Sequence, residues 1–277
     1  MKSFIALFTV FFITTVSLFS QPYATIGEYE NAIQQKFEQA AMPSPDSVKS
    51  SLHTNIEELL AGALIIPGAF EYPFDSLKKV GKITSRDGKI RIFTWERIRN
   101  DGSHHYYGFI LYRRKNPENP LLVKLINCSG SIMDPTLQVL GPDSWFGALY
   151  YEIIERKWND VTLYTLLGYD PNDIFTSRKI IDCFYMKDGT TPVFGAPLFI
   201  LKNKIQNRVI FEYAAKVSMS LRYNEKLKMI VFDHLSPAKP SYAGNYQFYG
   251  PDFSYDVFKF TENCWVLFED VDIRNPE

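Results

Sequence analysis

The stretch of residues 241–256 holds the densest candidate binding chemistry, because aromatic residues alternate there with glycine, proline and acidic residues. Aromatic rings offer apolar area and carboxylates orient hydroxyl or amino groups, so this combination suits the recognition of sugars or peptides. The alternative is an ordered loop whose rings close one end of a sheet. The predicted ligand-binding residues are Tyr242, Tyr246, Tyr249, Asp252, Tyr255 and Asp256.

A second pattern, at residues 170–173, concerns metal binding. Asp170, Asn172 and Asp173 place three oxygen-bearing side chains in one turn, and hard cations such as calcium need six or more oxygen ligands. The segment lacks the later glutamate and the fixed glycine of a calcium loop. Asp and Asn are also ordinary turn formers, because their side chains bond their own backbone. The pattern therefore predicts either a cation site or a plain turn.

A pair of carboxylates is the enzymatic option that the sequence leaves open. In glycoside hydrolysis two acids face each other across a cleft, and one is protonated while the other is ionised. The sequence does not give the separation of such a pair in space, so glycan hydrolysis stays an alternative. The acids that would supply it are Asp182, Asp233, Asp252, Asp256 and Glu269.

The four histidines favour neither a zinc hydrolase nor a serine hydrolase. His234 beside Asp233 has the form of an acid–base pair, but no Gly-x-Ser-x-Gly motif accompanies it. His104 and His105 are adjacent, and adjacent side chains on an extended chain point to opposite faces. No His-Glu-x-x-His motif, Cys-x-x-Cys motif or phosphate-binding glycine loop occurs, so no cofactor is predicted.

Composition narrows the partners and the redox chemistry. The chain has 30 basic and 31 acidic residues and no basic stripe, so no nucleic-acid partner is expected. Cys128, Cys183 and Cys264 form an odd set, which allows at most one disulfide within the chain and leaves the pairing open. Cys183 and Cys264 lie in apolar runs and are expected to be buried thiols.

The elements that must position these residues change character near residue 75. Thr25 and Glu28 have the spacing of a capping box, and apolar residues then recur at helical spacing, which predicts a helix over residues 26–41. Asp46 or Ser47 is expected to cap a second helix. Together they form a predicted two-helix unit.

From about residue 82 the pattern becomes that of short strands separated by turns, and the clearest hairpin is centred on Asp87-Gly88. The connections are too short for crossover helices, so no parallel sheet is expected. The predicted fold is mainly β, or α+β overall, with a long antiparallel β-meander of barrel-like or sandwich-like form. A β-propeller is the alternative, although the blade-like segment at residues 84–89 has no second copy.

The first twenty residues have the pattern of an export signal, with Lys2 followed by an apolar run from Phe4 to Phe19 and then Ser20. This run is shorter than the roughly 20 apolar residues that span a bilayer, so no transmembrane segment is expected after cleavage. The predicted organisation is a signal peptide at residues 1–20, a helical unit at 21–74 and an antiparallel β domain at 75–277. Such a protein would be periplasmic or secreted.

Several stretches carry a family resemblance: YTLLGYD at residues 164–170, KIIDCFY at 179–185, RVIFEYAAKVSMSLRYN at 208–224, MIVFDHLSP at 229–237 and YQFYGPDFSYD at 246–256. With them the chain resembles a group of exported proteins of Bacteroidota-type bacteria over most of residues 75–274. The resemblance implies that the protein is located in the cell envelope, in agreement with the N-terminal pattern. It brings no activity, substrate or catalytic residue with it.

We therefore expect a non-catalytic exported protein that binds a ligand or another protein of the cell envelope. The alternative is a secreted carboxylate-dependent glycan hydrolase. That alternative requires two of the five acids named above to line one cleft roughly 5 to 10 Å apart, beside an aromatic ring.

Overall fold

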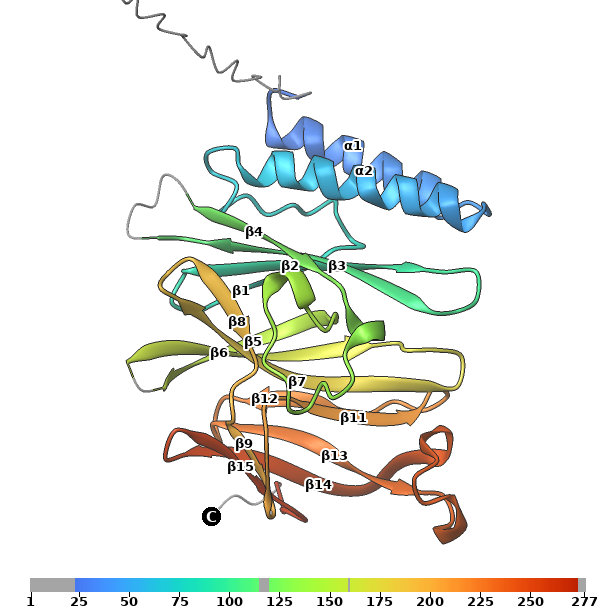
Figure 1. Ribbon diagram of the computed structural model, residues 1–277, viewed down its shortest axis with the longest axis vertical. Coiled ribbons are helices and arrows are strands. Elements are labelled where there is room, and N and C mark those ends of the chain that lie inside the picture. Colours follow the sequence, from blue (N-terminus) through green and yellow to red (C-terminus); the bar gives the residue numbers. More distant parts are fainter. Residues whose placement is uncertain (1–22, 115–119, 159, 274–277) are drawn as a thin grey trace, which may run out of the picture.

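Two helices and three β-sheets lie in four stacked layers (Figure 1). The computed structural model describes residues 23–114, 120–158 and 160–273, so the predicted export signal at residues 1–20 lies outside the described residues. Strands account for 45% of the chain and helices for 19%. The prediction of a mainly β protein with an N-terminal two-helix unit is confirmed.

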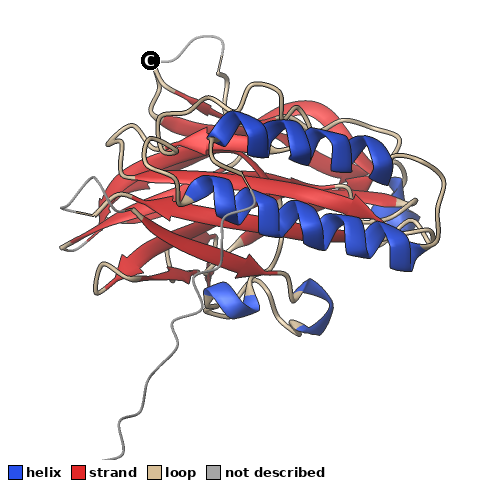
Figure 2. Ribbon diagram, turned by 90° about the horizontal axis from the view of Figure 1, so that it is seen from above, coloured by secondary structure: helices blue, strands red, loops and turns tan. Residues whose placement is uncertain are grey.

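The helical layer consists of α1 (Ile26–Ala40) and α2 (Asp46–Leu64), which lie side by side over the first sheet (Figure 2). The predicted capping box begins α1. The Thr25 hydroxyl accepts a hydrogen bond from the Glu28 amide at 3.2 Å, and the Glu28 carboxylate accepts one from the Thr25 amide at 3.0 Å.

The start of α2 differs from the prediction. Pro45 occupies the capping position and no side chain caps the helix, so the predicted cap at Asp46 or Ser47 is wrong. The Asp46 carboxylate instead accepts a hydrogen bond from the Asn100 amide at 3.0 Å, which ties the start of α2 to the β2–β3 turn.

The first sheet has the order β1-β2-β3-β4, the second has the order β11-β7-β6-β5 with β8 paired to β7, and the third has the order β10-β9-β15-β14-β13-β12. The strands are β1 (Gly81–Thr84), β2 (Ile90–Ile98), β3 (His104–Tyr112), β4 (Leu121–Ile126), β5 (Leu149–Trp158), β6 (Val161–Asp170), β7 (Thr176–Lys187), β8 (Thr191–Phe194), β9 (Phe199–Leu201), β10 (Lys204–Gln206), β11 (Val209–Ala214), β12 (Leu221–Asn224), β13 (Met229–Pro237), β14 (Tyr249–Thr261) and β15 (Cys264–Phe268). Short 3-10 helices are η1 (Ser129–Ser131), η2 (Pro142–Ser144), η3 (Pro240–Tyr242) and η4 (Tyr246–Phe248).

Alternation of side chains along the strands fills three separate apolar cores between the four layers. On β2, Phe93 and Trp95 pack with the helices, whereas Ile92 packs with the second sheet. On β7, Ile180 packs toward the first sheet and Ile181 toward the third. The second sheet is therefore buried on both faces. The sandwich-like form of the prediction is confirmed, and the described strands close no barrel.

One feature departs from the predicted antiparallel meander. Strand β9 runs parallel to β15 through the pairs Phe199–Trp265 and Ile200–Val266, within a sheet whose other strand pairs are antiparallel, so no parallel sheet forms among the described strands but one parallel pair does. These strands are far apart in sequence, which gives the chain room to return in the same direction. The sheets also lie one above another and not around a central axis, so the propeller alternative is not observed (Figure 1).

A buried ion pair joins the second sheet to the segment between β4 and β5. Asp182 on β7 and Arg208 just before β11 have side chains that are 0% exposed, and the Oδ2 and Nε atoms lie 2.9 Å apart. The Asp182 carboxylate also accepts hydrogen bonds from the Tyr150 hydroxyl at 3.1 Å and the Cys183 amide at 2.8 Å. Arg208 donates to the Pro135 carbonyl. Each charge thus has a partner inside the core, which a buried charge requires.

Removal of one member of this pair should destabilise the fold. We expect Arg208→Met to lower the free energy of unfolding by about 3–5 kcal/mol, because it leaves Asp182 as an uncompensated buried charge. The exposed Arg222 provides a matched control, and Arg222→Met should change the same quantity by less than about 0.5 kcal/mol. Urea denaturation measures both values. Equal losses in the two variants would show that the pair does not stabilise the core.

Candidate ligand-binding site

The predicted surface at residues 241–256 is mostly regular structure and not an irregular loop. Tyr249, Asp252, Tyr255 and Asp256 belong to β14, while the earlier residues form η3 and η4. The Tyr242 ring stacks on Phe248 with centroids 4.2 Å apart, and Tyr246 lies 5.1 Å from the Tyr249 ring. Tyr249 lines one surface hollow and Tyr255 another. The structure therefore spreads the six predicted residues over more than one place.

His234 forms a pair with Asp256 and not with its sequence neighbour Asp233. The His234 Nδ1 atom lies 2.8 Å from Asp256 Oδ2, and the other ring nitrogen lies 4.0 Å from Asp252 Oδ2. Asp233 instead accepts a hydrogen bond from the Ser220 amide at 2.7 Å. Successive side chains of β13 point to opposite faces, which explains why His234 does not pair with Asp233, in keeping with the sequence argument against a catalytic pair there. The hydrogen bond to Asp256 raises the pKa of His234, against the opposing effect of burial.

The five acids considered for glycan hydrolysis have separate roles. The Asp182 side chain is fully buried in the core. The Asp233 carboxylate accepts a hydrogen bond from the backbone amide of Ser220, just before β12. Asp252 and Asp256 lie on either side of His234, and the Glu269 carboxylate lies 3.0 Å from the Lys202 ammonium group. Burial opposes ionisation of Asp252, but hydrogen bonds from Ser254 lower its pKa, so it does not have the raised pKa of a general acid.

The turn predicted to bind a cation uses its oxygen atoms internally. Asp170 accepts a hydrogen bond from the Asn172 amide at 2.7 Å, and Asp173 accepts from the Thr176 amide at 2.8 Å. The Asn172 side chain donates to the Thr176 hydroxyl at 2.6 Å. Among residues 23–114, 120–158 and 160–273, no group of three or more His, Cys, Asp or Glu residues could hold a metal ion. The geometry is that of the plain turn.

Asp170 nevertheless takes part in a site, because it forms the floor of an open pocket of about 510 Å³. The start of β3, the segment that follows β4, and the β6–β7 turn frame this pocket between the first and second sheets. Its lining includes Arg99, Ser103, His104, Asn127, Ser129 and Asp170. We call it the intersheet pocket.

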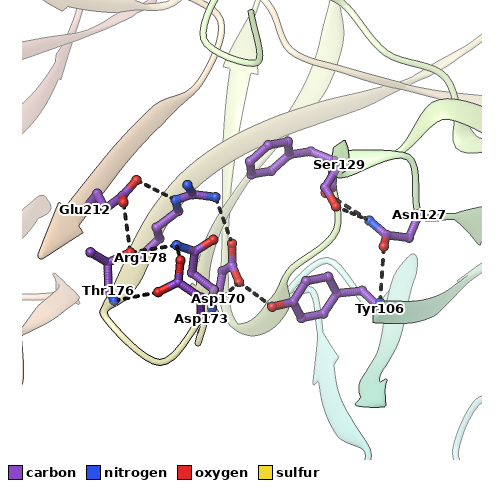
Figure 3. Close-up of polar contacts among 10 residues, drawn as sticks. Tyr106, Asn127, Ser129, Asp170, Asp173, Thr176, Arg178 and Glu212 are labelled. Atoms are coloured by element: carbon purple, nitrogen blue, oxygen red, sulfur yellow. Dashed lines mark hydrogen bonds and ion pairs between the residues drawn. The ribbon is translucent and has the colours of Figure 1, made fainter. Parts of the chain in front are cut away.

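The floor of the intersheet pocket is a charged network that joins the two sheets. The Tyr106 hydroxyl on β3 donates to Asp170 on β6, and Arg178 Nη1 lies 3.6 Å from the other Asp170 oxygen (Figure 3). Arg178 Nε lies 2.8 Å from the Glu212 carboxylate. Burial raises the pKa of Asp170, while the hydrogen bonds from Tyr106 and Asn172 and the charge of Arg178 act in the opposite direction. Both oxygens of Asp170 are thus engaged by the protein.

The rim of the intersheet pocket carries hydrogen-bonding groups of several kinds. The Asn127 amide group donates to the Ser129 hydroxyl at 3.1 Å, which orders the segment after β4. His104 lies 2.7 Å from Glu96. Burial, helped by the positive charge of Arg99, lowers the pKa of His105 to about 4, so its ring is neutral at neutral pH. The rim therefore presents hydroxyl, amide and imidazole groups together with guanidinium groups.

No motif in the sequence singles out Tyr106, Asn127 or Arg178. Their combination arises from tertiary structure, and the one local signal is the run of small polar residues from Asn127 to Ser131 directly after an apolar strand.

All three cysteines are free thiols. The expected burial is confirmed for Cys183, whereas Cys264 is only partly buried.

The His234–Asp256 pair predicts a specific pH dependence. We expect His234 to titrate above 6.5 in the folded protein and Asp256→Asn to lower that pKa, whereas the control Asp233→Asn leaves it unchanged. A raised pKa means that the stabilisation by the charged ring is fully present below pH 6.5 and is lost as the pH rises through the folded value. NMR titration of the ring protons measures the pKa, and an Asp256→Asn variant with the wild-type value would contradict the pairing.

Comparison with known proteins adds no relative: no protein-family model, no curated protein and no solved structure matches the chain. None of the helices in the described part of the chain is both long and apolar enough to cross a membrane.

Proposed function

We propose that this chain is an exported protein of the cell envelope that binds a small, hydroxyl-rich polar ligand in the intersheet pocket without transforming it. The observation that carries the proposal is the pocket itself, an open volume of about 510 Å³ with a polar rim over a buried charged floor. Ligand sites commonly place a few fixed polar groups in a concave surface. The Asp170–Arg178–Glu212 network fixes the floor of this pocket before any ligand arrives.

The chemistry of the rim indicates the class of ligand. Ser103 and Ser129 line the rim with hydroxyl groups, which suit a ligand rich in hydroxyl groups such as a glycan fragment. Arg99 adds a positive charge at the same rim. An acidic sugar or a peptidoglycan fragment would satisfy both features. The N-terminal pattern from Lys2 to Ser20 supports export of the protein to a compartment where such ligands occur.

Glycan hydrolysis has less support than binding. Canonical glycosidases need two carboxyl groups across the scissile bond. Asp170 is the one carboxylate among the residues that line the intersheet pocket. One of its oxygens accepts hydrogen bonds from Tyr106 and Asn172, and the other lies 3.6 Å from Arg178 Nη1. The acids predicted for hydrolysis lie elsewhere, as described above. The geometry favours holding a ligand over cleaving it.

Thermal unfolding in the presence of a panel of glycans, peptidoglycan fragments and divalent cations tests this proposal. A ligand at 100 times its Kd stabilises a protein by about 2.7 kcal/mol, which corresponds to a rise in Tm of roughly 5 to 11 °C for a chain of this size. We expect such a rise with a glycan or peptidoglycan fragment. A flat response to every glycan and fragment would contradict the proposal.

Gly130 offers a variant that blocks the pocket with little disturbance. It lines the pocket, and a Cβ atom placed on it meets no other heavy atom within 4 Å. We expect Gly130→Phe to place a ring in the pocket and abolish the rise in Tm, while the control Gly130→Ala retains it. Retention of the full rise in Gly130→Phe would show that the ligand binds at another place.

A further inference from the structure

A second cavity, of about 390 Å³, lies between the helical layer and the first sheet. The end of α1 and the first half of α2 form one side, and the end of β2 forms the other, at the face of the sheet that the helices cover (Figure 2). Lys79, from the segment before β1, and Leu149, at the start of β5 in the second sheet, complete the lining. We call this the helix–sheet cavity. It shares none of its lining residues with the intersheet pocket.

Positive charge dominates the lining of the helix–sheet cavity. Lys49, Lys79 and Arg97 line it, and Glu96 is the one acid among the lining residues. The Glu96 carboxylate lies 2.7 Å from the His104 ring. Lys49 donates to the Asn100 side chain at 2.8 Å, which leaves its charge without a carboxylate partner at that contact. The cavity therefore suits an anionic group.

Arg97 gives the strongest indication of an anion. The residue is only 8% exposed, yet its nearest carboxylate is that of Asp46, at 3.9 Å from Nη1, which is too far for a hydrogen bond. Its Nε atom is buried and finds no hydrogen-bond partner among the described residues. The guanidinium also interacts with the Tyr107 hydroxyl, which carries no charge. A buried charge is costly unless it is paired and hydrogen-bonded, and the 3.9 Å contact with Asp46 supplies no hydrogen bond, so Arg97 lacks a hydrogen-bonded anionic partner among the described residues.

His53 is a second buried polar residue of this cavity, and it lies on α2, across the cavity from Arg97 on β2. It is 6% exposed, its Nδ1 atom has no hydrogen-bond partner within the described part of the chain, and it lines the same cavity. The His53 ring stacks on Tyr107 with centroids 5.4 Å apart and meets the Phe37 ring edge-on at 5.8 Å. These contacts fix the ring. A buried polar atom without a partner is uncommon in native proteins and calls for a specific explanation.

The remaining lining is apolar and determines the other half of the ligand. Phe37, Ala40, Ala41, Ile98 and Leu149 line the cavity together with the basic residues. We propose that the helix–sheet cavity binds a small amphipathic carboxylate, with its carboxylate group on Arg97 and Lys79 and its apolar body against the end of α1. The carboxylate geometry matches a guanidinium, which donates two parallel hydrogen bonds.

The charge state of His53 provides a readout inside the cavity. Burial, together with the positive charge of Arg97, lowers the pKa of His53 to about 4. A bound carboxylate favours the imidazolium form, so it should raise this pKa. The imidazole group of His234, which lies on β13 in the third sheet, should not follow.

Isothermal titration calorimetry of the full protein at constant ionic strength tests the proposal with three probes. Sodium octanoate carries both required features, 1-octanol lacks the charge and inorganic phosphate lacks the apolar body. We expect octanoate to bind and the other two to bind at least about tenfold more weakly, since a hydrogen-bonded charge is lost in one and the apolar contact in the other. Octanol or phosphate binding as tightly as octanoate would overturn the proposal.

Variants locate the binding. Arg97→Gln should weaken octanoate binding at least about tenfold. Because substitution of the buried Arg97 also destabilises the fold, Lys79→Gln serves as the second variant, and the neighbouring exposed Lys78→Gln is its matched control. We expect Lys79→Gln to weaken binding several-fold and Lys78→Gln and Gly130→Phe to leave it unchanged. Undiminished binding in Lys79→Gln, or an unchanged His53 pKa in NMR with octanoate, would overturn the assignment.

Discussion

The buried pair of Asp182 and Arg208 is the interaction on which the arrangement of the second sheet depends. A charge inside a β-sandwich is tolerated only where a partner of opposite sign and hydrogen bonds complete it. Arg208 meets this condition by reaching both the Asp182 carboxylate and the Pro135 carbonyl, so it joins β7 to the long segment between β4 and β5. Asn207 strengthens the same junction, because its amide donates to the Thr136 carbonyl at 2.7 Å. That segment begins with the residues that form one wall of the intersheet pocket.

Strand β3 links the two cavities through the alternation of its side chains. Tyr106 points toward the second sheet and bonds to Asp170, while Tyr107 points toward the helices and stacks on His53. His104 and His105 follow the same alternation, as expected for adjacent residues on an extended chain. Each cavity lies where a pair of layers ends, so polar groups there can meet a ligand while the apolar cores stay closed.

The predicted elements agree with the observed ones where local pattern decides. The capping box of Thr25 and Glu28 and the hairpin at Gly88 follow from residues that are close in sequence. The strands β8, β9 and β10 were not predicted, because each has only three or four residues, which is too short for an alternating pattern to be recognised, and β9 also pairs with the distant β15. The same reason explains the His234 pairing, which joins β13 to β14 across the sheet and not to the adjacent Asp233.

The sequence by itself determined the class of fold, the helical start and the period-two strands, because these follow from backbone propensity and from the spacing of apolar residues. It also placed Asp170 and Asn172 in a turn. Only the tertiary structure decided that three sheets stack, that Asp182 is sealed, and that Tyr106 and Arg178 meet at Asp170. The physical reason is that a side chain acquires its burial and its charged partner from strands of other sheets, and a single sequence does not state which strands become neighbours.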